Sequence, residues 1–174
     1  QAESLFEAVL QAFGKVDVLV NNAGVMALST LNETSDDDFN EQFDVNMKGV
    51  FNMLRLASKH LHQGGSIINL STSVVGLKLG VYAATKSAVE TMSAILSKEL
   101  RGKDIAVNCV APGPTETDLF TEGKSQELID KLANMSPMER LGQPEDIANV
   151  VNFLASDEGH WVNGQVLRAN GGII

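Results

Sequence analysis

Tyr82 and Lys86 are the two residues whose types and spacing most directly suggest chemistry, because one helical turn separates them in the segment YAATK. Residues four apart lie on the same face of a helix. A free tyrosine has a pKa of about 10 and is a poor proton acceptor at neutral pH. A cation about 4 Å away stabilises the phenolate by about 4 kcal/mol at an effective dielectric constant of about 20, which equals about three pKa units. The pair is therefore a candidate for proton transfer, with a surface pair as the alternative.

Three further polar segments follow predicted strands. NNAG occupies residues 21–24, STS residues 71–73 and PGPTET residues 112–117. In parallel α/β sheets, ligands bind outside the carboxyl ends of the strands. We therefore expect these segments and the start of the Tyr82 helix to line one cleft.

Alternating helix and strand patterns position these segments. Apolar residues at helical spacing predict one helix that ends at Gly14, one that runs from a cap at Thr34 or Ser35 to Gly64, and one over residues 82–100. Runs rich in β-branched residues predict buried strands at 16–20, 66–70 and 105–110 and a last strand in GQVLRANGG. Pro144 opens another helix, and residues 119–138 read as a mobile lid. The pattern predicts one α/β domain over residues 1–174, with a doubly wound parallel sheet covered by helices on both faces.

The composition restricts the function classes. With 22 acidic and 13 basic residues the net charge is −9, which argues against a nucleic-acid or anionic-membrane binder. No apolar run reaches the about 20 residues of a transmembrane helix. Cys109 is the single cysteine, and we interpret it as a core residue of a cytoplasmic protein. His60, His62 and His160 lack metal-binding spacing, so we read them as surface residues and predict no metal site.

The motifs resemble one known family. NNAG, Asn46 in NMKG, the serine segment, YAATK and PGPTET follow the order and approximate spacing of the short-chain dehydrogenase/reductase family, and the tail LGQPEDIANVVNFLASDE is also similar to it. The resemblance covers essentially the whole chain. It implies a Rossmann-like fold and an NAD(P)-dependent oxidoreductase that transfers a hydride between the nicotinamide and a ketone or secondary alcohol. Because the motifs most resemble 3-oxoacyl-acyl-carrier-protein reductases, a 3-oxoacyl thioester is one expected substrate.

The resemblance also implies catalytic roles. A carbonyl that accepts a hydride develops alkoxide character and needs a proton donor, which would be Tyr82. Lys86 lowers the pKa of Tyr82 and bonds the nicotinamide ribose. Asn46 holds a water that connects Lys86 to solvent, with a cap or kink in its own helix as the alternative. Ser73, which begins SVVG, matches the serine that holds the substrate oxygen, and Ser71 is the runner-up.

A cofactor-binding set follows from the same resemblance. It comprises Asn22, Ala23, Gly24, Tyr82, Lys86, Pro112, Gly113, Thr115 and Thr117. The expected cofactor is NADP or NAD, with NADP preferred. Pro112 and Gly113 also fit a plain turn after a strand. We expect Asn21 to be architectural and to bond the backbone of a neighbouring strand.

The chain departs from the family pattern in two places. The Gly-rich fingerprint of the first βα turn is absent, so we expect about one third more sequence upstream, with the missing amino-terminal strands in βα units of about 30 residues. Eight residues separate Ser73 from Tyr82, a few fewer than in related sequences, as if residues were missing between Leu79 and Gly80. Both departures support the alternative of a non-catalytic cofactor-binding or scaffold member, and the intact catalytic set argues against it.

The predicted helices also suggest self-association. The apolar faces of helices 39–62 and 82–100 are wider than is needed to cover one face of the sheet. Phe51, Met53 and Ile95 are therefore available for contacts with another chain. By resemblance these helices pair across a two-fold axis, and the carboxy-terminal strand makes a second interface, giving a homotetramer. The expected partners are a small-molecule carbonyl substrate and further copies of this chain.

Overall fold

The computed structural model describes residues 1–74 and 78–174. The SVVG segment (residues 73–76) named above therefore lies partly outside the described residues. The described elements are α1 (Ala2–Phe13), β1 (Val18–Asn21), α2 (Asp36–Gln42), a π-helical segment (Phe43–Gly49), α3 (Val50–His60), β2 (Ser66–Leu70), α4 (Gly80–Glu99), β3 (Ala106–Pro112), α5 (Asp118–Thr121), α6 (Gln126–Ala133), α7 (Pro144–Ala155), a 3₁₀ turn (Asp157–Gly159) and β4 (Val166–Ala169).

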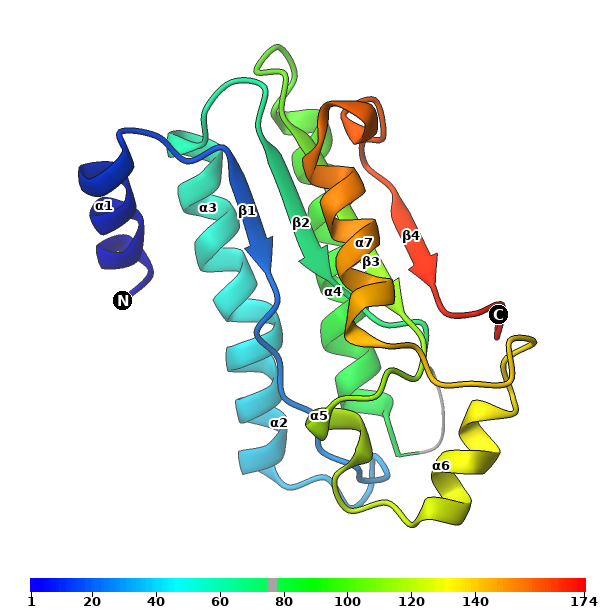
Figure 1. Cartoon of the computed structure of the whole chain (residues 1–174). Coiled ribbons are helices and arrows are strands. Elements are labelled where there is room, and N and C mark those ends of the chain that lie inside the picture. Colours follow the sequence, from blue (N-terminus) through cyan, green and yellow to red (C-terminus); the bar gives the residue numbers. More distant parts are fainter. Residues whose placement is uncertain (75–77) are drawn as a thin grey trace.

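The four strands form one parallel sheet in the order β1-β2-β3-β4. Helices α3 and α4 lie on one side of the sheet and α7 lies on the other (Figure 1). All strands point the same way, so their carboxyl ends face the region of α5, α6 and the start of α4 (Figure 1). The predicted α/β, Rossmann-like parallel sheet with helices on both faces is confirmed.

Two apolar clusters, one on each face, stabilise the sheet. Ile67, Val107 and Cys109 pack toward α3 and α4, whereas Ile68 and Val110 pack toward α7. Successive strand residues point to opposite faces, so strands covered on both sides read as continuous apolar runs. The core position predicted for Cys109 is confirmed, because its side chain is fully buried.

The prediction of a fully buried first strand was wrong. Leu19 is buried, but Val18 and Val20 are 39% and 42% exposed. Leu19 points toward α3, while Val18 and Val20 point to the opposite face, where α7 packs on β2, β3 and β4. The alternation of exposure along β1 is thus the alternation of the pleat, with cover on one face only.

The second predicted helix exists but is not uniform. Ser35 caps it, accepting a hydrogen bond from the Asp38 backbone N–H at 3.1 Å. Between α2 and α3 the helix widens into the π-helical segment, which contains Asn46. A π-segment inserts an extra residue and frequently marks a functional position. Val50, Leu54 and Ala57 of the predicted stripe are buried, as expected.

The remaining elements follow the sequence signals. Gly14 ends α1 in the left-handed conformation with φ 77°, and Pro144 occupies the first turn of α7. Residues of the predicted lid form α5 and α6, and their mobility stays a prediction. None of the described helices combines the length and apolar character needed to cross a membrane.

Candidate active site

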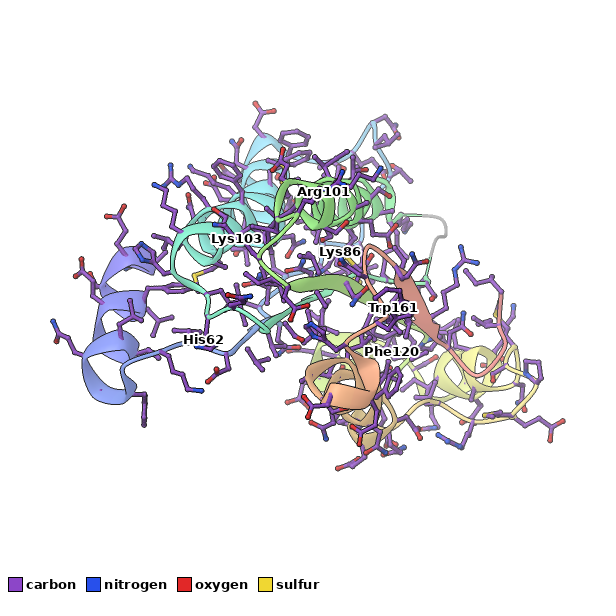
Figure 2. All side chains as sticks on the ribbon, turned by 90° about the horizontal axis from the view of Figure 1, so that it is seen from above. His62, Lys86, Arg101, Lys103, Phe120 and Trp161 are labelled. Atoms are coloured by element: carbon purple, nitrogen blue, oxygen red, sulfur yellow. The ribbon has the colours of Figure 1, made fainter. Side chains whose placement is uncertain are left out.

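Tyr82 and Lys86 lie in the first turns of α4 and are both buried, with exposed fractions of 9% and 5%. The Lys86 ammonium lies 5.7 Å from the centre of the Tyr82 ring. It donates a hydrogen bond to the Leu70 carbonyl oxygen, 2.9 Å away, where β2 ends. Figure 2 shows Lys86 in the interior of the molecule, beneath the ribbon of α4. The pair is therefore no surface pair, because both side chains are withdrawn from solvent.

Burial moves the pKa values of the two groups in opposite directions. Desolvation raises the pKa of Tyr82, and a hydrogen bond with the Thr72 side chain acts against this by lowering it. Desolvation lowers the pKa of Lys86. Both shifts favour the neutral form of the group, as burial of ionisable groups does in general.

Asn46 and Gly24 complete the surroundings of the Lys86 ammonium. The Asn46 side chain pairs with the backbone of Val25: its Oδ1 accepts from the Val25 N–H and its Nδ2 donates to the Val25 carbonyl, both at 2.8 Å. A Cβ built on Gly24 would lie 3.3 Å from both Asn46 Oδ1 and Lys86 Nζ. The backbone of Gly24 therefore packs closely against the buried ammonium, with little room there for a side chain.

Two roles were predicted for Asn46, holding a relay water and forming a cap or kink in its own helix, and the geometry bears on the second. Asn46 is fully buried and lies in the π-helical segment, so it does sit at an irregularity of its helix. Its amide also donates to the Thr85 hydroxyl at 3.2 Å, on α4. Asn46 therefore ties the segment after β1 to α4, and its relay role stays a prediction.

The three residues that precede Gly24, namely Asn21, Asn22 and Ala23, differ in exposure. Asn21 is buried and donates to the Asn69 side-chain oxygen on β2 at 2.7 Å. Its architectural role is as expected, but its partner is a side chain and not the backbone. Asn22 and Ala23 are exposed at the carboxyl end of β1, in the position expected of residues that contact a ligand.

The serine segment after β2 directs its three hydroxyl groups to different places. Ser71 donates to the Glu90 carboxylate on α4. Ser73 donates to the Ala111 carbonyl on β3 at 2.7 Å. The Thr72 side chain acts against the burial-raised pKa of Tyr82. The structure therefore brings Tyr82, Lys86 and Asn46 together, and the substrate-holding role of Ser73 stays a prediction.

The segment after β3 is a compact turn. Gly113 donates its N–H to the Ala169 carbonyl at 3.0 Å, and a Cβ on Gly113 would lie 2.8 Å from Asn170 Cα. The Thr115 hydroxyl donates to the Gly113 carbonyl at 2.9 Å, and Thr117 is exposed. Pro112 and Gly113 thus form the plain turn after a strand that was the alternative from the sequence. The cofactor contacts expected of Pro112, Gly113, Thr115 and Thr117 stay a prediction.

The described residues hold no group of three or more His, Cys, Asp or Glu side chains that could bind a metal ion. His160 is not a fully exposed residue, since its ring nitrogen lies 3.1 Å from the Asp104 carboxylate with the His160 side chain 28% exposed. His62 is exposed near Asp17, in a part of the molecule distant from Lys86 (Figure 2). The histidines therefore add nothing to the candidate site.

Sequence reasoning missed Thr72, Thr85 and Glu90. Thr85 and Glu90 stand three and eight residues after Tyr82, so their shared helix could have suggested a place near the site. Thr72 lies between two serines, and only the path of the chain after β2 decides which hydroxyl points to Tyr82.

Comparison with known proteins identifies the family. The whole chain, residues 1–174, matches the family described as enoyl-(acyl carrier protein) reductase. A short-chain type dehydrogenase/reductase of Picea abies is 49% identical over 179 residues, covering 99% of this chain and 66% of that protein. An NADPH-dependent aldehyde reductase-like protein, chloroplastic, of Arabidopsis thaliana is 46% identical over 182 residues, covering 100% of this chain and 67% of that protein.

A solved structure agrees with these relatives. The chain superposes on a short-chain dehydrogenase from Burkholderia cenocepacia in complex with NADP with a TM-score of 0.90 at 30% identity, covering 99% of this chain and 71% of that one. This chain belongs to the short-chain dehydrogenase/reductase family. It spans about two thirds of the length of the two curated relatives named above.

Proposed function

We propose that this chain carries the catalytic residues of an NADPH-dependent oxidoreductase that interconverts a carbonyl compound and the corresponding alcohol. The observation that carries the proposal is the burial of Tyr82 and Lys86 together beside the bare backbone of Gly24. We further propose that residues 1–174 are part of one dinucleotide-binding domain, because their four strands form a single sheet.

The cofactor fits these residues. The Lys86 ammonium lies at the carboxyl end of the sheet, close to the Gly24 backbone and bonded to the Leu70 carbonyl, and an ammonium suits the hydroxyl groups of a ribose as acceptors. Asn22, Ala23 and Gly24 would contact the cofactor at the end of β1, and Lys86 would bond its ribose. When bound, the nicotinamide supplies the hydride for reduction or accepts it in oxidation.

The proton chemistry belongs to this chain. Tyr82 gives its phenolic proton to the oxygen of the carbonyl as that oxygen becomes an alcohol, and takes it back in the reverse direction. Lys86 favours the phenolate form because its charge lies 5.7 Å from the ring centre. Asn46 holds the backbone of Val25 in place and would hold a water that returns protons to Tyr82 through Lys86.

Two finer assignments rest on the relatives. NADPH is supported by the Arabidopsis relative named as NADPH-dependent and by the NADP complex of the Burkholderia protein. Aldehydes are proposed as substrates because the same Arabidopsis relative is named as an aldehyde reductase-like protein. 3-Oxoacyl thioesters are proposed because of the motif resemblance.

The test is the loss of reduced-nicotinamide absorbance with the full protein, given NADPH or NADH and small aldehydes, diketones or acetoacetyl thioester. Wild type should oxidise NADPH in preference to NADH, and Tyr82→Phe should lower kcat by at least about 10²-fold while still binding NADPH. A folded wild type that binds NADPH and turns over none of these substrates would contradict the proposal and favour the non-catalytic alternative.

We also propose that the protein is a cytoplasmic homotetramer. Phe51 on α3 and Ile95 on α4 are 46% and 48% exposed, and Trp161, near β4, is 97% exposed. Exposed apolar side chains on these two surfaces support interfaces through helices 39–62 and 82–100 and through the carboxy-terminal strand. Sedimentation velocity should show a tetramer, and a monomer at micromolar concentration would refute the assembly.

A further inference from the structure

Three successive residues where β2 ends are each hydrogen-bonded to a side chain of α4. The three pairs, called here the polar seam, are Asn69 with Ser93, Leu70 with Lys86, and Ser71 with Glu90. The seam lies among apolar residues of one buried cluster, to which Ile67 on β2 and Val89 on α4 belong. In such surroundings an unpaired polar group is costly, so the seam fixes the end of β2 relative to α4.

The Ser71–Glu90 pair has no place in the proposed chemistry, unlike Lys86, which serves it directly. Ser71 is 4% exposed, and Glu90 is half-buried, although glutamate side chains are mostly exposed in folded proteins. Hydrogen bonds to carboxylates are stronger than those between neutral groups. Glu90 therefore holds Ser71 firmly, which makes the pair a candidate for orienting the chain after β2.

The chain after β2 is also fixed to β3, on its other side. The N–H groups of Ser71 and Ser73 donate to carbonyl oxygens of β3, both at 2.8 Å. The Ser73 hydroxyl donates to the Ala111 carbonyl, also on β3, at 2.7 Å. These three bonds set the path of the segment along the sheet. The bond from Ser71 to Glu90 adds a connection to α4, the helix that carries Tyr82.

We propose that Glu90 is a positioning residue, which holds the segment after β2 at a fixed place relative to the Tyr82 phenol by binding the Ser71 hydroxyl. One continuous helix carries both Tyr82 and Glu90, so a contact made by Glu90 is rigidly related to the phenol. Ser73, the candidate for holding the substrate oxygen, follows Ser71 by two residues. A misplacement of about 1 Å at a reacting centre can lower a rate by about 10²-fold. Glu90 acts through Ser71 and not on the substrate, and its role rests on the proposed function.

Two substitutions at Glu90 separate positioning from an effect of charge. In the Ser71–Glu90 bond the serine hydroxyl donates and the side-chain oxygen of Glu90 accepts. Glu90→Gln keeps an oxygen acceptor at the same distance from the backbone and removes the charge, whereas Glu90→Leu removes both. The distinction is needed because Lys86 precedes Glu90 by four residues and shares its face of α4. Positioning requires the acceptor alone.

The experiment measures NADPH oxidation by the full protein with Glu90→Leu, Glu90→Gln, Ser71→Ala and a control, Glu99→Leu, which changes an exposed glutamate at the end of the same helix. Glu90→Leu and Ser71→Ala should each lower kcat by on the order of tenfold, with the KM for NADPH unchanged because Lys86 stays in place. Glu90→Gln should keep most of the turnover. The double variant Ser71→Ala/Glu90→Leu should lose no more than the worse single variant, because both changes break one bond. Glu99→Leu should behave as wild type.

A second measurement needs no turnover. Amide hydrogen exchange, read by mass spectrometry, reports the N–H groups of Ser71 and Ser73 that are bonded to β3. They should exchange faster in Glu90→Leu and Ser71→Ala than in wild type and Glu90→Gln.

Three results would each refute the positioning role: unchanged exchange in Glu90→Leu, a Glu90→Gln protein as impaired as Glu90→Leu, or additive kcat losses in the double variant. Urea unfolding shows which variants are folded. If Glu90→Leu is not, Ser71→Ala breaks the same bond with a smaller change and is judged by its own kcat and exchange. A wild type without turnover would contradict the proposed function, and the exchange comparison would still decide whether Glu90 fixes the segment.

Discussion

Replacing Lys86 by methionine should raise the pKa of Tyr82, because the substitution removes the cation that favours the phenolate. The ammonium lies 5.7 Å from the ring centre. At this separation and an effective dielectric constant of about 20, the interaction is worth about 3 kcal/mol, or about two pKa units. Burial lowers the pKa of Lys86, so its ammonium is less fully charged where Tyr82 ionises and two units is an upper value.

The sign of the effect on activity follows from the direction of the reaction. Reduction needs the Tyr82 phenol protonated and proceeds below its pKa, whereas alcohol oxidation needs the phenolate and proceeds above it. In Lys86→Met, the alkaline pH at which oxidation reaches half its maximum should therefore rise by up to about two units. The assay is the pH profile of alcohol oxidation, measured beside the phenolate titration of the same proteins.

The matched control is Lys48→Met, which removes an exposed lysine paired with Asp44. It should leave the titration of Tyr82 unchanged. Lys86→Met also deprives the Leu70 carbonyl of its donor, and urea unfolding checks that the variant is folded under the conditions of the titration. A shift of the Tyr82 pKa below about half a unit, equal to about 0.7 kcal/mol, would show that Lys86 does not tune the phenol.

Three further substitutions have defined outcomes. Gly24→Ala should weaken NADPH binding by about tenfold, or 1.4 kcal/mol, because its Cβ would press on the Lys86 ammonium and the Asn46 side chain and displace them; fluorescence titration measures this, and unchanged affinity would contradict it. Asn46→Ala leaves both Val25 backbone groups unpaired and should lower the free energy of unfolding by about 2 kcal/mol, checked by urea unfolding. The Arg140 guanidinium and the Gln143 N–H hold the pKa of Asp146 at about 2, so Asp146 stabilises the fold above its ordinary pKa and loses that contribution as pH falls toward 2. Arg140→Leu should raise the Asp146 pKa toward its ordinary value in an NMR titration, and an unchanged value would refute the pairing.

Much of the scaffold could be predicted from the sequence, because the signals were local. The strand predicted at residues 66–70 matches β2, and the expected helix start at Pro144 matches α7. Each depends on short-range features, namely a β-branched apolar run and a proline in the first turn. The approach of Gly24 to Lys86 at the start of α4 could be predicted for a similar reason, since parallel strands end at one edge of the sheet, whereas Asn46 was placed there by the family resemblance alone.

The rest depended on contacts between distant segments. The exposure of Val18 and Val20 arises from where α7 packs, which strand periodicity does not contain. The π-helical segment at Asn46 inserts one residue into an otherwise regular stripe, and an averaged 3.6-residue period hides it. The direction of the Ser73 hydroxyl is set by the Ala111 carbonyl on β3, 38 residues along the chain, which the serine motif does not contain.

The burial of Lys86 is better explained by function than by stability. An ammonium carries three hydrogen-bond donors, and the described residues give Lys86 one acceptor, the Leu70 carbonyl. Desolvation lowers its pKa, which means that the surroundings oppose the charge. A buried cation with donors left over lowers stability unless another group satisfies it. The two remaining donors are therefore available to an external group with oxygen acceptors, such as the ribose of the proposed cofactor. The same cation stands over the ring of Tyr82, which is the arrangement that the proposed dual role of Lys86 in binding and proton transfer requires.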